Sequence, residues 1–130
     1  MKKVAFLVPA CSYNLPEGDL NDQHLVKIFM RSLLAHTPDF DIRIYIGFNN
    51  DDPLYSHEEN RVELSSRIYD NFNIHISWYE FSNEYRGKPT WIWNDLTQRA
   101  INDNYHYMFA CGDDIQFPKQ KEWLGVMVKQ

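Results

Sequence analysis

The chain has 130 residues, 44% of them apolar and 24% charged, which is typical of one globular domain with a single core. The formal net charge is −5 and no basic block occurs, which excludes the phosphate-neutralising surface of a nucleic-acid-binding protein. No run of about 18 apolar residues occurs, so no membrane span is predicted. Two cysteines are too few for a disulfide framework, and we therefore expect a cytoplasmic protein with free thiols.

Short apolar runs alternate with amphipathic stretches along the whole chain. Proline, glycine, asparagine and aspartate separate these segments, which sets the expected boundaries. In chain order we predict a strand at 3–9, a loop at 10–20, a helix from 21 or 22 that Pro38 ends, a strand at 41–48, a helix at 57–71, a strand at 74–81, a loop at 82–88, a helix at 90–102, a strand at 105–111 and a helix at 122–129.

Apolar spacing predicts which faces of the first two helices are buried. In the first helix the stripe follows the i, i+3, i+4 pattern, and Asn21 or Asp22 is the expected cap. The stripe consists of Leu25, Ile28, Phe29, Ser32 and Leu33. The second helix is more polar, and we expect its inward positions to be Val62, Leu64 and Ile68.

This β-α-β-α-β-α-β order predicts an α/β fold. Strands that alternate with helices are joined by right-handed crossovers, so we expect a mostly parallel, Rossmann-like sheet in a three-layer α-β-α sandwich. We expect a single domain over residues 1–130. In such sheets ligands bind beyond the carboxyl ends of the strands. The loops that follow the four strands are therefore the expected functional edge.

The segment after the last predicted strand carries the strongest chemical signal. Cys111, Gly112, Asp113 and Asp114 follow an apolar run, and two adjacent carboxylates at a strand end repel one another. A divalent cation relieves that repulsion, because oxygen ligands suit Mg²⁺ and Mn²⁺. A metal site at this edge of the sheet is one interpretation. A surface turn with two solvated aspartates is the other.

Polar residues also follow the second and third strands. Asn49, Asp51 and Asp52 offer side-chain acceptors that suit a base or a ribose, while Arg86 and Lys88 precede a helix whose N–H groups favour anions. Ordinary solvated loops are the alternative for both groups. If the loops converge, acids for a metal and bases for phosphates meet at one edge.

These segments together resemble the nucleotide-binding half of GT-A fold glycosyltransferases. The run 107–115 resembles the DxD segment of that family, whose acids bind a divalent cation that bridges the diphosphate of a nucleotide sugar. The run 4–9 resembles the first strand of the family, whose end contacts the nucleoside. The resemblance spans nearly the whole chain through short and degenerate pieces.

The resemblance implies a metal-dependent transfer of a sugar from a nucleotide-diphosphate sugar, with a UDP-sugar as the main donor, to a hydroxyl of a glycan or protein acceptor. It implies Mn²⁺ or Mg²⁺ at Asp114 and Asp113. The residues implied at the donor are Pro9, Ala10, Asn49, Asp51, Asp52, Arg86, Lys88 and Asp113. No catalytic base is identified.

Two departures from that family keep a second function open. Gly112 stands where the first acid of DxD is usual, and the chain ends sixteen residues after Asp114, so we expect a C-terminally truncated GT-A-like fold. A non-catalytic nucleotide-sugar-binding or interaction module is therefore the alternative. A polymerase palm, which shares Gly-Asp-Asp, is disfavoured by the missing basic channel. We also expect an exposed sheet edge to favour self-association.

Two smaller expectations concern aromatic residues and thiols. Trp91 and Trp93 head the third helix and are predicted to be core residues, with stacking on a sugar ring as the alternative. In the resembled fold the first and fourth strands are neighbours, which would bring Cys11 and Cys111 to the ends of adjacent strands.

Overall fold

The computed structural model describes residues 2–13, 18–35 and 40–117. Its centre is a four-stranded sheet in which every pairing is parallel and the strand order is β3-β2-β1-β4. The strands are β1 (Lys3–Pro9), β2 (Asp41–Asn49), β3 (His75–Phe81) and β4 (Tyr107–Ala110). The predicted α/β class and parallel sheet are confirmed.

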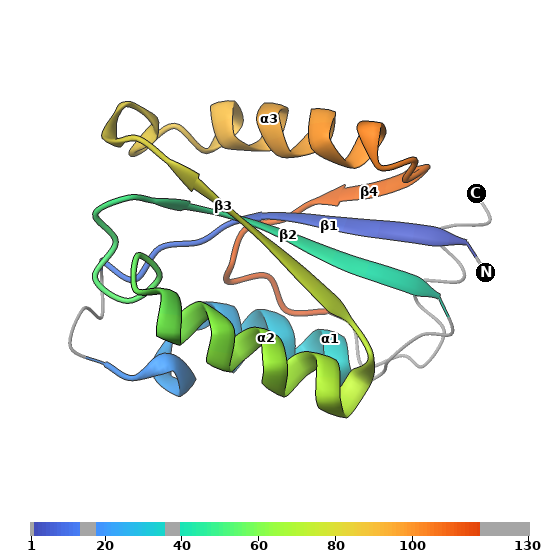
Figure 1. Cartoon of the computed structure of the whole chain (residues 1–130), viewed down its shortest axis with the longest axis horizontal. Coiled ribbons are helices and arrows are strands. Elements are labelled where there is room, and N and C mark those ends of the chain that lie inside the picture. The colour runs from blue at the N-terminus through green and yellow to red at the C-terminus, as the bar shows by residue number, and fades with distance from the viewer. Residues whose placement is uncertain (1, 14–17, 36–39, 118–130) are drawn as a thin grey trace.

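Helices cover both faces of the sheet, which confirms the predicted three layers. The helix α3 (Pro89–Asn102) lies on one face, and α1 (Arg31–Ala35) and α2 (Glu58–Phe72) lie on the other (Figure 1). Side chains of β1 alternate between the layers, because successive residues of a strand point to opposite faces. Val4, Phe6 and Val8 pack in the core under α1 and α2, whereas Ala5 and Leu7 pack in the core under α3.

The helix α3 packs close to the sheet because β2 carries a glycine, Gly47, beneath it. A Cβ atom at Gly47 would lie 2.6 Å from Ile92 Cγ2 and 2.8 Å from Phe81 Cε2. Any side chain at this position would displace α3 or the end of β3. Gly47 therefore lets the first turn of α3 approach the carboxyl end of the sheet, where the loops meet.

The start of the first helical region differs from the prediction. Asp19, not Asn21 or Asp22, is the capping residue: its side chain accepts hydrogen bonds from the N–H groups of Asn21 and Asp22. The capped element is the short 3₁₀ turn η1 (Leu20–Asp22), and the backbone becomes extended at Gln23. A π-helical segment, η2 (Leu25–Met30), then runs into α1.

The predicted buried stripe of this helix is confirmed only in part. Leu25, Phe29 and Leu33 are fully buried, whereas Ile28 and Ser32 are half-buried. The three buried positions are four residues apart and so lie along one face. Pro38 and the predicted helix at 122–129 lie outside the described residues.

Two other predictions are wrong in detail. Val62 is 56% exposed, whereas Leu64 and Ile68 are buried as expected. The fourth strand begins at Tyr107 and not at Tyr105, because Tyr105 N–H donates to Ala100 O and Asn104 adopts a positive φ of 66°. These two residues complete the end of α3, and the shortened β4 is a half-buried edge strand instead of a fully buried one.

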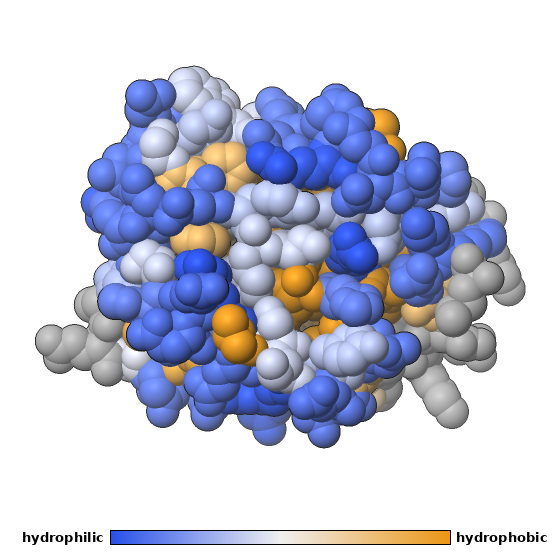
Figure 2. Space-filling model, viewed as in Figure 1, coloured by the Kyte–Doolittle hydropathy of each residue, from blue (hydrophilic) through white to orange (hydrophobic). Residues whose placement is uncertain are grey.

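The face of the molecule that Figure 2 shows is mostly polar. Figure 2 shows hydrophilic residues over α3 and α2, with hydrophobic and intermediate residues gathered between them over the edge strand β3. That distribution agrees with the half-buried side chains of β3. No helix in the described part of the chain has the length and apolar character that a membrane span requires.

Candidate functional site

A pocket of about 390 Å³ opens at the carboxyl ends of β1 and β2, beside the start of α3. Five of the residues predicted to contact a donor line it: Pro9, Ala10, Asn49, Arg86 and Lys88. The sequence interpretation did not assign its other lining residues, which are Cys11, Tyr13, Tyr85, Gly87, Pro89 and Ile92. The loops after β1, β2 and β3 therefore converge as expected.

Backbone hydrogen bonds continue the sheet into this site. Ala10 N–H donates to Gly47 O at 2.8 Å, which extends the pairing of β1 with β2. Asn50 N–H donates to Phe81 O at 2.8 Å, and the Asn49 amide nitrogen donates to Ser82 O at 3.2 Å. The inner wall of the pocket is consequently part of the rigid sheet.

An ion pair and an aromatic ring hold the rim. Arg86 lies 3.7 Å from Asp51, and its guanidinium carbon lies 4.1 Å from the centre of the Tyr13 ring. The Tyr13 hydroxyl donates to Asp51, and burial together with this carboxylate raises the pKa of Tyr13 above its ordinary value. The charge of Arg86 is therefore already shared with a carboxylate.

Lys88 differs from Arg86 because no described carboxylate pairs with its charge. Its ammonium lies 4.0 Å from the centre of the exposed Trp91 ring, and among the described residues it makes no ion pair. Lys88 is also the N-cap residue of α3, and its side chain does not cap the helix. Pro89, the first residue of α3, has no N–H, and the N–H groups of Trp91 and Ile92 donate to Lys88 O. The helix α3 thus adds the partial positive charge of its dipole beside the ammonium, and not a set of free N–H groups.

The two aspartates after β4 adjoin the pocket through Cys11. Cys11 N–H donates to Asp113 Oδ2 at 3.3 Å, which joins the loop after β1 to the loop after β4. Burial, and then the charge of Asp114, raise the pKa of Asp113 above its ordinary value. Asp114 is exposed, and its Oδ1 lies 2.9 Å from the place that a Cβ atom of Gly112 would occupy.

The donor chemistry of this corner fits a hard divalent cation that is shared with a ligand. Asp113 and Asp114 supply carboxylate oxygens, and a cation would offset the cost of their repulsion and partial burial. Within residues 2–13, 18–35 and 40–117 no group of three or more His, Cys, Asp or Glu side chains could hold a metal ion. A cation here would therefore need oxygens from a diphosphate or from water.

Asp52 requires a correction, because the structure turns it away from the pocket. Its side chain is fully buried and accepts hydrogen bonds from Ser12 N–H at 2.7 Å and from the Ser12 hydroxyl at 2.5 Å. The N–H groups of Leu54 and Tyr55 donate at 3.0 and 2.8 Å to Oδ1, the same oxygen that accepts from the Ser12 hydroxyl. The predicted donor contact of Asp52 is replaced by a structural role.

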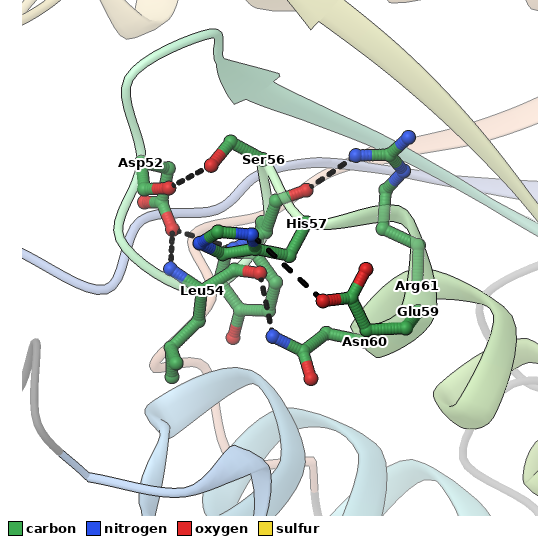
Figure 3. A network of polar contacts seen from close by, with 8 residues as sticks. Asp52, Leu54, Ser56, His57, Glu59, Asn60 and Arg61 are labelled. Atoms are coloured by element: carbon green, nitrogen blue, oxygen red, sulfur yellow. Dashed lines mark hydrogen bonds and ion pairs between the residues drawn. The ribbon is translucent and has the colours of Figure 1, made fainter.

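Figure 3 shows the loop that Asp52 begins. The Ser56 hydroxyl donates to the Asp52 carbonyl, and the Asn60 amide donates to Leu54 O at 2.9 Å. Arg61 donates to Tyr55 O at 2.7 Å from the first turn of α2. Polar groups of the loop and of the first turn of α2 thus bond its backbone, and Asp52 joins this loop to the loop after β1 through Ser12.

The positions of Trp91, Trp93 and the two cysteines agree only in part with the predictions. Trp93 is half-buried and its indole N–H lies 3.0 Å from Leu7 O and 3.3 Å from Cys111 O, so it ties the ends of β1 and β4 together. Trp91 is 49% exposed, and its prediction as a core residue is wrong. Both cysteines are free, with Cys11 exposed and Cys111 buried.

The rim residues that sequence reasoning missed are Tyr13 and Tyr85. Both lie in loops that were expected to form the functional edge, so their position after a predicted strand was the available signal. Comparisons with known protein families, with curated proteins and with solved structures found no match to this chain.

Proposed function

We propose that this chain is a metal-dependent glycosyltransferase, or the donor-binding half of one, that binds a nucleotide-diphosphate sugar. One observation carries the proposal: a pocket lined by Lys88, which forms no ion pair with any described residue, adjoins a pair of carboxylates, Asp113 and Asp114, at the carboxyl edge of a parallel sheet. A ligand that carries both a ring system and a diphosphate has groups for each part of this site.

The pocket suits the nucleoside end of such a donor. Its walls combine apolar surface from Pro9, Ala10 and Ile92 with the amide of Asn49, and its rim carries the aromatic ring of Tyr13. Small-molecule sites in proteins typically pair apolar walls with a few polar groups that fix orientation. These groups support a nucleoside position between the loops after β1 and β3.

The charged groups suit the diphosphate. Lys88 and the positive end of the α3 dipole would attract the phosphate oxygens, and Asp113 and Asp114 would hold Mn²⁺ or Mg²⁺ with those oxygens completing its coordination. A bound cation would neutralise charge that develops on the leaving diphosphate. The ammonium of Lys88 would stabilise the same developing negative charge.

The first experiment measures binding of UDP and GDP by calorimetry, with and without Mn²⁺. We expect one nucleoside diphosphate to bind more tightly with Mn²⁺ present, because the cation brings the phosphate oxygens and the two carboxylates together. In Asp114→Ala the effect of Mn²⁺ should disappear while the weaker metal-free binding remains.

Asp95→Ala serves as the control, because Asp95 pairs with Arg99 on the exposed side of α3 and the Mn²⁺ effect should persist. Absence of nucleoside diphosphate binding in the presence of Mn²⁺ would remove the proposal.

Gly112 favours a second candidate, a non-catalytic nucleotide-sugar-binding module. It leaves the two carboxylates at the second and third positions of the segment, whereas the resembled motif has its acids at the first and third. Binding measurements do not separate the two functions. Hydrolysis and transfer assays separate them, because a binding module leaves the donor intact. The assays use the sugar derivative of the nucleoside diphosphate that binds.

A further inference from the structure

The hydroxyl of Tyr55 is buried without a hydrogen-bond partner. Tyr55 is fully buried, and of the buried side-chain nitrogen and oxygen atoms in the described residues only its hydroxyl and Arg43 Nε lack a partner. Buried hydroxyl groups in folded proteins almost always make a hydrogen bond, because leaving one unpaired is unfavourable. The position of this hydroxyl therefore needs an explanation.

The rest of Tyr55 is held firmly. Its N–H donates to Asp52, its carbonyl accepts from Arg61 at 2.7 Å, and its ring lies 5.8 Å from the ring of Trp78. It belongs to the same buried cluster as Cys111, two residues before Asp113. A ring fixed in this way holds its hydroxyl in one place, as a positioning residue must.

Hydrogen bonds join the loop that contains Tyr55 to the carboxylate corner. Asp52, which accepts the Tyr55 N–H, also accepts from Ser12, and the N–H of the preceding residue, Cys11, donates to Asp113. Burial raises the pKa of Tyr55 above its ordinary value, and the charges of Asp113 and Asp52 raise it further. Of these neighbours, Asp52 is already satisfied by four donors. Asp113 accepts the N–H of Cys11 on Oδ2 and a hydrogen bond from its own N–H, which is two donors against the four of Asp52. Asp113 is thus the nearby acceptor with room for another donor.

A carboxylate that binds a cation in a half-buried place needs more than one hydrogen bond. Residues that donate to metal-bound carboxylates fix their orientation and strengthen metal binding. Cys11 N–H fills one position on Asp113, and the cation would take another. A donor that approaches from the core under α1 and α2, where Tyr55 lies, would complete the set.

We propose that Tyr55 is a positioning residue for the divalent cation of the proposed donor site, and that its hydroxyl donates to Asp113 when the cation is bound. This inference rests on the proposed function. If it is correct, the loop after β2 helps to hold the cation together with the loop after β4. Tyr55 does not touch the substrate.

The test compares Tyr55→Phe with the wild type in two measurements. Without metal, urea unfolding should show the variant to be as stable as the wild type or more stable, because the substitution removes an unpaired hydroxyl and keeps the ring. With saturating UDP, the affinity for Mn²⁺, measured from free Mn²⁺ by electron paramagnetic resonance, should fall about 10-fold.

Tyr45→Phe is the matched control. Tyr45 is also fully buried, but its hydroxyl donates to Asp103 at 2.5 Å near the other end of the sheet. We expect this control to lose stability without metal and to keep the affinity for Mn²⁺. The two variants should therefore show opposite patterns.

The outcomes separate this inference from the proposed function. A metal-free Tyr55→Phe that is less stable than the wild type would mean that the hydroxyl already has a partner, such as a resident water, and would overturn the inference. An unchanged affinity for Mn²⁺ would overturn it as well and leave the donor site standing. A wild type that binds no Mn²⁺ with UDP would remove both.

Discussion

Replacing Asp52 with alanine is expected to lower the free energy of unfolding by about 3–5 kcal/mol, which is a large part of the stability of a domain this size. Ser12 contributes two of the donors to this carboxylate, and the N–H groups of Leu54 and Tyr55 contribute the others. Removing the carboxylate leaves them buried beside a cavity. Urea unfolding followed by circular dichroism measures the loss.

Two variants sharpen this test. Asp52→Asn keeps one oxygen but places an NH₂ group against a donor, so its loss should be intermediate. Asp51→Ala removes the neighbouring aspartate, whose side chain is 39% exposed and pairs with Arg86 across the surface, and its loss should be below about 1 kcal/mol. Equal losses for Asp51→Ala and Asp52→Ala would contradict the structural role given to Asp52.

Replacing Lys88 with alanine is expected to weaken UDP binding in the presence of Mn²⁺ by about 10- to 100-fold, the range of a hydrogen bond to a charged group. Lys88 brings an ammonium that no described carboxylate neutralises, and it stands at the start of α3. Calorimetry of the variant against the wild type gives the ratio of the dissociation constants.

The neighbouring cation provides the contrast. Arg86→Ala should weaken binding less than Lys88→Ala, because Asp51 already offsets the charge of Arg86. Lys88→Arg should recover part of the affinity, since it restores the charge but not the shape. Lys27→Ala, on the helix at the opposite face of the sheet, should bind as the wild type does. A larger loss for Arg86→Ala than for Lys88→Ala would reverse the assignment.

The strands were predictable because their signal is local. The run Val4–Val8 is apolar and ends at a proline, and residues 42, 44 and 46 of β2 are isoleucines, so burial and strand period agree along each segment. The observed bounds of β1, β2 and β3 lie within one residue of the expected ones. The neighbouring position of β1 and β4, which the resemblance implied, is also confirmed.

The helices show where local pattern is insufficient. Val62 was expected to face inward together with Leu64. The two residues are two positions apart, which is about 200° around a helix, so they lie on opposite sides of α2. Leu64 and Ile68 already define the buried face. In the first helical region several residues can cap, and Asp19 is favoured because Asp22 accepts its N–H in return.

The site was predictable in its location and less so in its members. Loops after parallel strands meet at one edge, which is why Asn49, Arg86 and Lys88 were found together. The roles of Asp52 and Tyr55 depend on partners far along the chain. Ser12, which binds Asp52, lies 40 positions away, and no spacing rule connects them.

The strand order has a consequence for synthesis of the chain. β1 is made first, yet it lies inside the sheet between β2 and β4, and Cys111 N–H bonds to Leu7 O across the whole sequence. One side of β1 therefore stays unpaired on the ribosome until residues 107–110 have emerged. Exposed strand edges recruit other chains, so slow translation over the second half of the message would lengthen the time in which nascent chains can associate wrongly.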